Sequence, residues 1–233
     1  MKQITFSSNG ITLKGNLYLS ENKNSAGLLF LHGGGTATKE RFVDLQEYLL
    51  KHGFSSFAFD FQGVGDSEGE FSSGSLHNRL KNAKSAFDEL KKYVNKIIVI
   101  GTSMGGHVAA RLTESRNVNS LILLYAATYA KEAEDKPLNE EFTKILRAEN
   151  SWQTSLAFSA IERYTGQIVM IYGENDNVVP KGLQQRFKSL INKERFLILA
   201  NAGHLLLNPQ NELQQIAKNQ VFEEILSFFK NIN

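Results

Sequence analysis

The residues best suited to chemistry surround Ser103. The segment Gly101 to Gly105 reads Gly-Thr-Ser-Met-Gly, a G-x-S-x-G pattern. An apolar run leads in and a helix-compatible stretch leads out, as a sharp strand-to-helix turn carrying a nucleophilic serine requires. Glycine suits the flanking positions because bulky side chains would clash there. In a chain with 18 glycines, the bare pattern arises by chance about once in ten chains, so a turn with an inert serine is the alternative.

A serine hydroxyl is a weak nucleophile at neutral pH and needs a base, normally histidine. His204 follows the small residues Ala202 and Gly203, in a loop after the last apolar run. That setting leaves the backbone free to aim the ring. Among the other histidines, His52 ends a helical stretch, while His77 and His107 lie within such stretches. We therefore expect His204 to be the base.

A carboxylate is needed to orient that histidine. The apolar run Ile168 to Tyr172 ends at Gly173, and a polar turn containing Glu174 and Asp176 follows. Sites in open α/β sheets form at the carboxyl ends of strands. We favour Asp176 over Glu174 on the pattern of the family described below. The alternative for Asp176 is an ordinary turn or helix-capping aspartate.

A second glycine-rich segment predicts an anion site. A strand candidate delivers His32-Gly33-Gly34-Gly35 into a loop. Acyl transfer creates an oxyanion that needs preplaced donors, and glycines let backbone N–H groups approach it. We expect the backbone N–H groups of Gly34 and Met104 to be these donors. His32 is expected to shape the loop, with its ring nitrogens bonded to backbone groups, and not to act as the base.

Short apolar runs alternate with longer amphipathic stretches, which predicts a parallel sheet with helical crossovers. Asn9-Gly10 predicts a hairpin turn between the first two strands. The expected strands are residues 4–7, 11–19, 27–31, 54–60, 96–100, 120–125, 167–172 and 195–199, and helices are expected over 39–52, 75–93 and 103–114. The three prolines should lie outside the interiors of strands and helices.

Residues 126–166 contain no strand candidate and are expected to form a small helical cap inserted between two strands. Within this segment, Tyr129, Trp152 and Phe158 are candidates for lining an acyl pocket. Each could equally pack between the cap and the core.

Composition bounds the class of protein. The 233 residues are 42% hydrophobic and 21% charged, which suits one globular domain over residues 1–233. The chain has no cysteine, which excludes thiol chemistry and fits a cytoplasmic location. No signal peptide or membrane-spanning run is evident. The net charge of +2, without a basic block, argues against nucleic-acid binding.

Taken together, these segments make the chain resemble the α/β-hydrolase superfamily over essentially its whole length. The branch with serine aminopeptidase-like and monoacylglycerol-lipase-like hydrolases and small esterases is the most similar. That branch carries His-Gly-x-x after the third strand and an Asp-x-x-Gly-x-Gly-x-Ser loop after the fourth, here Asp60 to Ser67. Members of the family usually have Arg at the position of Gln62 in this chain, and they more often have His at the position of Thr102. The order Ser, Asp, His also fits this fold.

The resemblance implies a mostly parallel sheet with an antiparallel N-terminal hairpin and helices on both faces. It implies Ser103, Asp176 and His204 as a catalytic triad, an acyl-enzyme, and no cofactor or metal. Asp60 and Asp66 are expected to be structural. We expect a carboxylesterase acting on a small or medium acyl ester. A peptidase, thioesterase, acyltransferase or lyase on the same triad, or a ligand-binding receptor, remain alternatives. The oligomeric state is left open.

Overall fold

The computed structural model describes residues 1–22 and 26–230. In that part of the chain eight strands form one sheet in the order β1-β2-β4-β3-β5-β6-β7-β8. The pairs β1–β2 and β2–β4 are antiparallel, and all other neighbouring strands are parallel. The strands are β1 (Lys2–Ser8), β2 (Ile11–Tyr18), β3 (Gly27–Leu31), β4 (Ser55–Phe59), β5 (Ile97–Thr102), β6 (Ser120–Leu124), β7 (Gln167–Gly173) and β8 (Phe196–Leu199).

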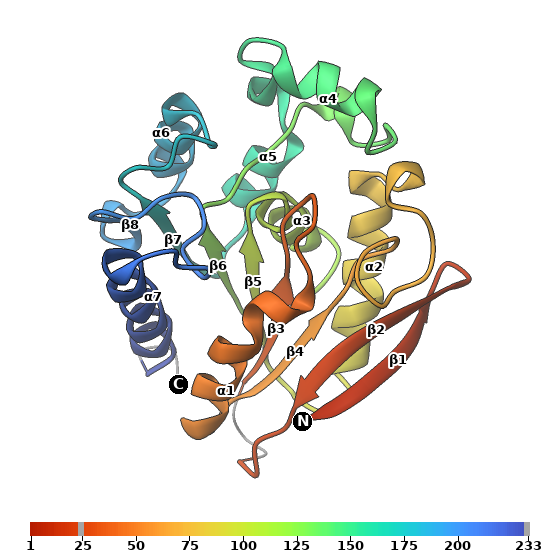
Figure 1. The fold of residues 1–233 in the computed structure, drawn as a ribbon, viewed down its shortest axis with the longest axis vertical. Coiled ribbons are helices and arrows are strands. Elements are labelled where there is room, and N and C mark those ends of the chain that lie inside the picture. The colour runs from red at the N-terminus through yellow and green to blue at the C-terminus, as the bar shows by residue number, and fades with distance from the viewer. Residues whose placement is uncertain (23–25, 231–233) are drawn as a thin grey trace.

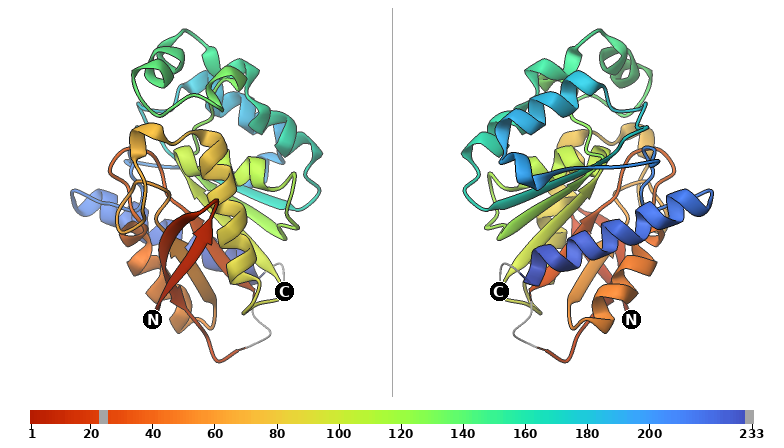
Figure 2. Two further views of the ribbon diagram at one scale, coloured as in Figure 1. Left: turned by 90° about the vertical axis from the view of Figure 1, so that its right-hand side faces the viewer. Right: turned by 90° about the vertical axis from the view of Figure 1, so that its left-hand side faces the viewer.

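Helices cover both faces of this sheet (Figures 1 and 2). Helices α1 and α7 pack together on one face, and α2 and α3 pack together on the other. The helices are α1 (Val43–Lys51), α2 (Leu76–Leu90), α3 (Met104–Leu112), α4 (Glu140–Arg147), α5 (Leu156–Arg163), α6 (Lys181–Leu190) and α7 (Glu212–Lys230). Short 3₁₀ turns occur at Lys39–Phe42, Phe71–Ser73, Lys131–Ala133, Ser151–Thr154 and Lys193–Arg195. The expected fold class is confirmed.

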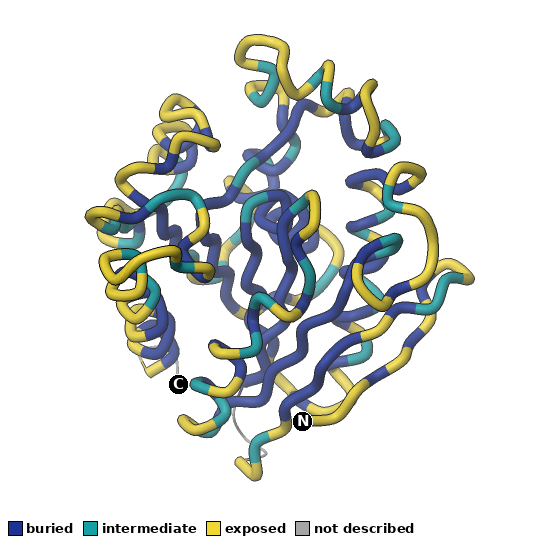
Figure 3. Tube along the Cα trace, viewed as in Figure 1, coloured by how far each residue is buried: buried dark blue, intermediate teal, exposed yellow. Residues whose placement is uncertain are grey.

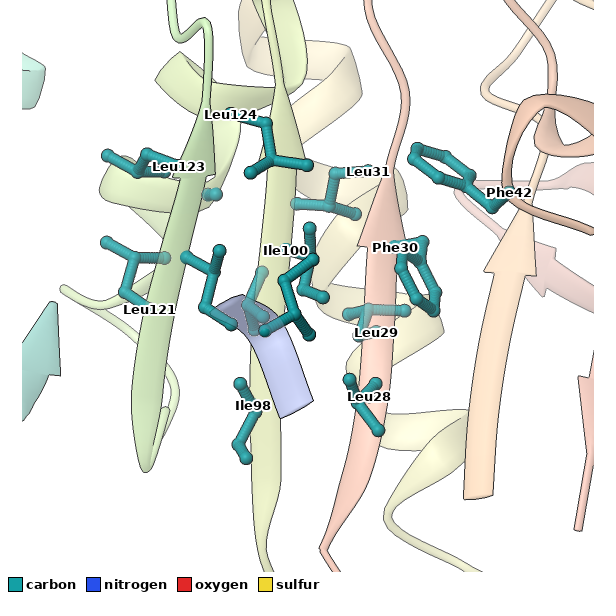
Figure 4. Packing of buried hydrophobic residues seen from close by; sticks show 14 of the residues in the cluster. Leu28, Leu29, Phe30, Leu31, Phe42, Ile98, Ile100, Leu121, Leu123 and Leu124 are labelled. Carbon is teal, nitrogen blue, oxygen red and sulfur yellow. The ribbon is translucent and has the colours of Figure 1, made fainter. Parts of the chain in front are cut away.

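The core lies in the middle of the sheet. Every residue of β3, β4, β5 and β6 is buried, and Figure 3 shows this as a dark band through the centre of the molecule. Figure 4 shows the leucine and isoleucine side chains of β3, β5 and β6 packed against one another, with the Phe30 ring tilted against that of Phe42. Continuous apolar runs are what strands covered on both faces require. By contrast, β1 alternates buried and exposed residues because it lies at the sheet's edge.

Local sequence signals explain the ends of several elements. Asn9 and Gly10 both have positive φ, as the expected tight hairpin turn demands. Ser75 caps α2 by accepting a hydrogen bond from the Asn78 N–H at 3.1 Å. Pro137 and Pro209 lie in loops and Pro180 precedes α6, so the expectation for the prolines is confirmed.

The segment between β6 and β7, residues 125–166, contains α4 and α5 and no strand. Helix α4 lies above the carboxyl ends of the strands (Figure 1), capped by Asn139, whose side chain accepts from the Glu141 N–H. Helix α5 packs against α3 and α6, so the end of the segment joins the helical layer on the sheet. The part that overhangs the sheet therefore centres on α4.

An ion cluster around the buried pair Lys39 and Asp60 holds the loop after β4. The Lys39 ammonium donates to Asp60 and Asp66, both at 2.7 Å, and the Lys39 backbone N–H donates to the other Asp60 oxygen. Burial alone would lower the pKa of Lys39, but the hydrogen bonds to the two carboxylates outweigh it and raise the pKa. Asp60 and Asp66 therefore make structural contacts.

We expect Lys39→Met to lower the free energy of unfolding by about 3 kcal/mol, because it leaves the fully buried Asp60 carboxylate without its cation. Chemical denaturation measures the loss. Lys92→Met is the matched control, since Lys92 pairs with Glu89 at the surface and should cost less than about 1 kcal/mol. Equal losses in the two variants would contradict a structural role for the cluster.

Candidate active site

Ser103 lies in the turn between β5 and α3. Its backbone adopts φ 49° and ψ −118°, a conformation that non-glycine residues rarely hold. The turn is fixed by the Ser103 N–H, which donates to the Leu124 carbonyl at 3.1 Å, and by the Ser103 carbonyl, which accepts from Gly106 and Ala127. The hydroxyl does not cap α3. It is therefore available for other partners.

The two glycines of the motif are required by close packing. A Cβ on Gly101 would lie 2.5 Å from the Gly105 carbonyl oxygen and 2.7 Å from the Ala109 Cβ. A Cβ on Gly105 would collide with the Leu31 carbonyl and lie 2.7 Å from the His32 carbonyl oxygen. The start of α3 thus presses directly on the end of β3, which brings the serine beside the loop that follows β3.

We expect Gly105→Ala to lower the free energy of unfolding by roughly 3 kcal/mol, because its methyl group would overlap backbone that cannot move aside. Thermal or chemical denaturation measures the loss. Gly203→Ala serves as the stability control, since nothing lies within 4 Å of its added Cβ. A Gly105→Ala protein as stable as Gly203→Ala would show that the tight turn Gly101 to Gly105 around Ser103, called the elbow below, tolerates a side chain.

The structure brings together the three side chains singled out in the sequence. The His204 Nε2 lies 3.1 Å from the Ser103 Oγ, and the His204 Nδ1 lies 3.0 Å from the Asp176 Oδ2. Ser103 follows β5, Asp176 follows β7 and His204 follows β8, so the carboxyl ends of three strands supply the set. A hydroxyl, an imidazole and a carboxylate in this order can pass a proton from the hydroxyl to the ring.

Asp176 is held as a carboxylate. Its side chain is fully buried, and its Oδ1 accepts hydrogen bonds from the Val178 and Val179 N–H groups at 2.9 and 3.0 Å. Burial raises the pKa of Asp176, but the hydrogen bonds from His204 and the two backbone groups outweigh it and lower the pKa overall. Glu174, the competing carboxylate, instead accepts from the Asn201 N–H at 3.2 Å. The geometry therefore favours Asp176 as the partner of His204.

Tyr125 lies against the His204 ring, a contact that the sequence analysis did not predict. The two rings meet edge to face, with centroids 4.9 Å apart. Tyr125 is fully buried and has φ 39°, because the chain turns away from the sheet at the end of β6. Its contact limits the positions open to the imidazole. The sequence offered only its place at the end of an apolar run, which does not reveal a contact with a distant histidine.

The loop after β3 lies beside the serine. A Cβ on Gly33 would be 3.2 Å from the Ser103 Cβ, and a Cβ on Gly34 would be 3.0 Å from the Met104 Cε. Within the residues that the structure describes, neither the Gly34 N–H nor the Met104 N–H has a hydrogen-bond acceptor. Neither N–H is thus committed to another described residue, and their role as oxyanion donors stays a prediction.

His32 has both ring nitrogens bonded to backbone groups. Its Nε2 accepts from the Phe61 N–H at 3.2 Å, so its Nδ1 carries the proton and donates to the Gly33 carbonyl at 2.8 Å. Burial holds the pKa of His32 well below its usual value, and the nearby Arg79 cation lowers it further. A buried neutral ring with both nitrogens engaged can shape the loop but has no site left to accept the serine proton.

The three candidate pocket residues have different surroundings. Tyr129 is buried in an apolar cluster with Met104, Leu76 and Phe142, next to the elbow. Phe158 packs between α5 and α6, with its ring centroid 5.0 Å from that of Phe187. Trp152 packs edge to face on Phe158. These contacts place Tyr129 nearest the serine, and pocket lining by all three residues stays a prediction.

No group of three or more His, Cys, Asp or Glu side chains in residues 1–22 and 26–230 could hold a metal ion. No helix in the same ranges is both long and apolar enough to cross a bilayer.

The mostly parallel sheet, the serine elbow and the adjoining His–Asp pair define an α/β hydrolase. The chain belongs to the family described as serine aminopeptidase, S33, whose model matches residues 22–160. A second model, described as the alpha/beta hydrolase fold, matches residues 126–207.

Solved structures share the fold at low identity. Est1E from Butyrivibrio proteoclasticus, solved with ferulic acid, has a TM-score of 0.75 and 20% identity, covering 96% of this chain and 98% of its own. The meta-cleavage product hydrolase CumD from Pseudomonas fluorescens has a TM-score of 0.74 and 16% identity, covering 99% and 98%. The α/β hydrolase GrgF from Penicillium has a TM-score of 0.74 and 18% identity, covering 99% and 98%.

Among curated proteins, the multifunctional-autoprocessing repeats-in-toxin of Vibrio cholerae is 34% identical over 89 residues. The match includes 36% of this chain and about 2% of the toxin's length. A segment of Vibrio vulnificus toxin of the same name matches to the same extent.

Proposed function

We propose that this hydrolase is a serine carboxylesterase that cleaves a small or medium acyl ester through an acyl-enzyme on Ser103. One observation carries the proposal, a continuous chain of hydrogen bonds, here called the relay. It runs from the Ser103 hydroxyl to the His204 Nε2 at 3.1 Å and from the His204 Nδ1 to the buried Asp176 at 3.0 Å. Distances in this range permit proton transfer from the hydroxyl to the ring.

In the first half of the reaction, the Ser103 Oγ attacks the ester carbonyl carbon while its proton moves to the His204 Nε2. The carbonyl oxygen becomes an oxyanion, and the free N–H groups of Gly34 and Met104 donate to it. The ionised Asp176 stabilises the imidazolium. The tetrahedral intermediate then collapses, the ester C–O bond breaks, and the departing alcohol takes the proton from His204.

In the second half, water attacks the acyl carbon and gives a proton to His204. The same two N–H groups hold the second oxyanion. Collapse breaks the bond to the Ser103 Oγ, the serine recovers its proton, and the carboxylic acid leaves. These reaction steps use only the ester, water and the residues described above.

The proposed class of ligand, a small acyl ester, is supported by the side chains beside Ser103 and by what related folds bind. The apolar cluster around Tyr129 and Met104 adjoins the elbow, so an acyl group bound on that side of Ser103 would meet apolar side chains. Two proteins with this fold were solved with small molecules, Est1E with ferulic acid and DcsB with a substrate analogue. These likenesses support a small-molecule ligand. The cytoplasmic location remains a prediction.

A substrate panel tests the proposal. Wild-type protein and Ser103→Ala are assayed side by side on 4-nitrophenyl esters of increasing acyl length, on matched thioesters and on aminoacyl 4-nitroanilides. We expect the esters to give the highest kcat/KM and Ser103→Ala to be inactive. A preference for thioesters or aminoacyl amides would reassign the chain to thioesterase or peptidase chemistry. Transfer of the acyl group to an added alcohol in place of water would indicate an acyltransferase.

A fluorophosphonate probe separates enzyme from receptor. We expect it to label wild-type protein at Ser103 and not to label Ser103→Ala, because labelling requires the activated hydroxyl. If the folded wild-type protein is neither labelled nor active on any member of the panel, a ligand-binding role on an inactive triad is favoured.

A further inference from the structure

Arg79 is a buried cation without a carboxylate partner. It lies on α2, and only 2% of its surface is exposed. Among the described residues, no Asp or Glu comes within ion-pair distance of its guanidinium, and its Nη2 has no hydrogen-bond partner. Burial lowers the pKa of Arg79 to about 10, which still leaves it charged at neutral pH. An unpaired buried charge is costly, so its position calls for an explanation.

The guanidinium is held by one hydrogen bond and by the rings of Phe61 and Phe71, the latter with its centre 5.7 Å away. Its Nη1 donates to the Gly33 carbonyl oxygen at 3.0 Å. Its central carbon lies 4.6 Å from the centre of the Phe61 ring, a cation–π distance. Phe61 is the residue whose N–H donates to His32. Arg79 and His32 therefore belong to one assembly around the loop after β3.

The Gly33 carbonyl thus receives two hydrogen bonds, one from Arg79 at 3.0 Å and one from His32 at 2.8 Å. In a planar trans peptide, the carbonyl of one residue and the N–H of the next point in opposite directions. Holding the Gly33 carbonyl against Arg79 therefore turns the Gly34 N–H away from α2. Glycine on both sides of this peptide would otherwise leave its orientation loosely determined.

The positive charge adds an electrostatic effect. A cation at the carbonyl end of a peptide group draws electron density toward the oxygen and makes the N–H at the other end a stronger donor. The Gly33–Gly34 peptide packs against the elbow, since a Cβ on Gly33 would be 3.2 Å from the Ser103 Cβ. The neutral His32 ring also donates to this carbonyl, but it carries no charge to polarise the peptide.

We propose that Arg79 is a positioning residue for the oxyanion site, in which its guanidinium clamps the Gly33 carbonyl so that the Gly34 N–H faces the reacting carbonyl oxygen. This inference rests on the proposed function. The Arg79 guanidinium contacts Gly33, Phe61 and Phe71 and not Ser103 among the described residues, so in this proposal it acts through the Gly33–Gly34 peptide.

The test compares an ester with its thionoester, in which sulfur replaces the carbonyl oxygen. Sulfur is a weak acceptor and gains little from an oxyanion site, so the ratio of the two kcat/KM values reports on that site alone. We expect Arg79→Met to lower the oxygen-to-sulfur ratio about tenfold or more, because the Gly33–Gly34 peptide loses its polarising cation and one of the two hydrogen bonds that orient it. Both substrates are measured on one preparation, so any inactive fraction cancels from the ratio.

Asn82→Ala is the matched control. Asn82 is buried one turn further along α2, but it bonds to Gln62 and Ser8 and not to Gly33. The oxygen-to-sulfur ratio of Asn82→Ala should therefore equal that of wild type. If Arg79→Met does not fold, Arg79→Lys carries the same test with an expected fall of severalfold, since the shorter ammonium cannot reproduce the planar contact.

The outcomes separate this inference from the proposed function. A folded Arg79 variant whose ratio stays within twofold of wild type overturns the inference, whether both rates fall together or neither falls. Ser103-dependent ester turnover in wild type would still stand in that case. Absence of any such turnover in wild type would overturn the proposed function instead.

Discussion

Replacing His204 with alanine is expected to lower kcat for the preferred ester by about 10⁴-fold or more, with the fold retained. The reason is geometric, since the His204 Nε2 is the only titratable nitrogen brought to the Ser103 Oγ in the described part of the chain, at 3.1 Å. His32 cannot replace it, because both of its nitrogens are bonded to backbone groups. Steady-state kinetics together with a denaturation curve measure the effect.

The double variant Ser103→Ala/His204→Ala sharpens this prediction. Residues that act as one unit are not additive, so the double variant should be about as inactive as either single variant. His77→Ala is the matched control, since His77 is exposed and only approaches Asp135 at 3.5 Å. If His204→Ala keeps a tenth of wild-type activity, or if the two losses multiply, the relay does not operate as a unit.

Much of the fold was predictable because its strands carry a strong pattern. The apolar runs that became β3, β5 and β6 are buried on both faces, so their sequences are continuous and easily read. The convergence of Ser103, Asp176 and His204 followed from the rule that parallel strands end at one edge of the sheet. Strand ends differed by one or two residues, as at β5, which extends to Thr102. Two helix ends were further off, since the helix expected over 39–52 begins as a 3₁₀ turn with α1 only from Val43, and the helix expected to reach residue 93 ends at Leu90.

What the sequence could not give was the set of contacts around those side chains. Arg79 stands three residues after Leu76 and four before Ala83, on the buried stripe of α2, and an arginine there is a readable anomaly. Its partner, the Gly33 carbonyl, lies 46 residues away on the chain and cannot be inferred from spacing. The same holds for Tyr125, whose backbone turn and contact with His204 depend on how β6 ends against its neighbours.

The second large effect concerns Asp176. We expect Asp176→Asn to lower kcat by about 10³- to 10⁴-fold with little loss of structure, because the substitution would favour the wrong tautomer of His204. The Val178 and Val179 N–H groups both donate to the Asp176 Oδ1. An asparagine would place its carbonyl oxygen toward these donors and its NH₂ group toward the His204 Nδ1. That nitrogen would then have to accept, leaving the proton on Nε2, where it faces the Ser103 hydroxyl.

The carboxylate's charge is the second part of this argument. The lowered pKa of Asp176 keeps it ionised at neutral pH, so in wild type it stabilises the imidazolium that forms as Ser103 attacks. Because that pKa lies below its unfolded value, the stability it contributes is present at neutral pH and is lost only as the pH falls through the folded pKa.

Asp176→Asn should therefore show a shallower loss of stability in acid, measured by denaturation midpoints from neutral pH downward. Glu174→Gln is the matched control for activity, because the Glu174 side chain bonds only to the Asn201 N–H among the described residues, and it should keep activity within about threefold. Similar activity losses in both variants would mean that the carboxylate acts through general charge near His204 and not through the tautomer that it selects.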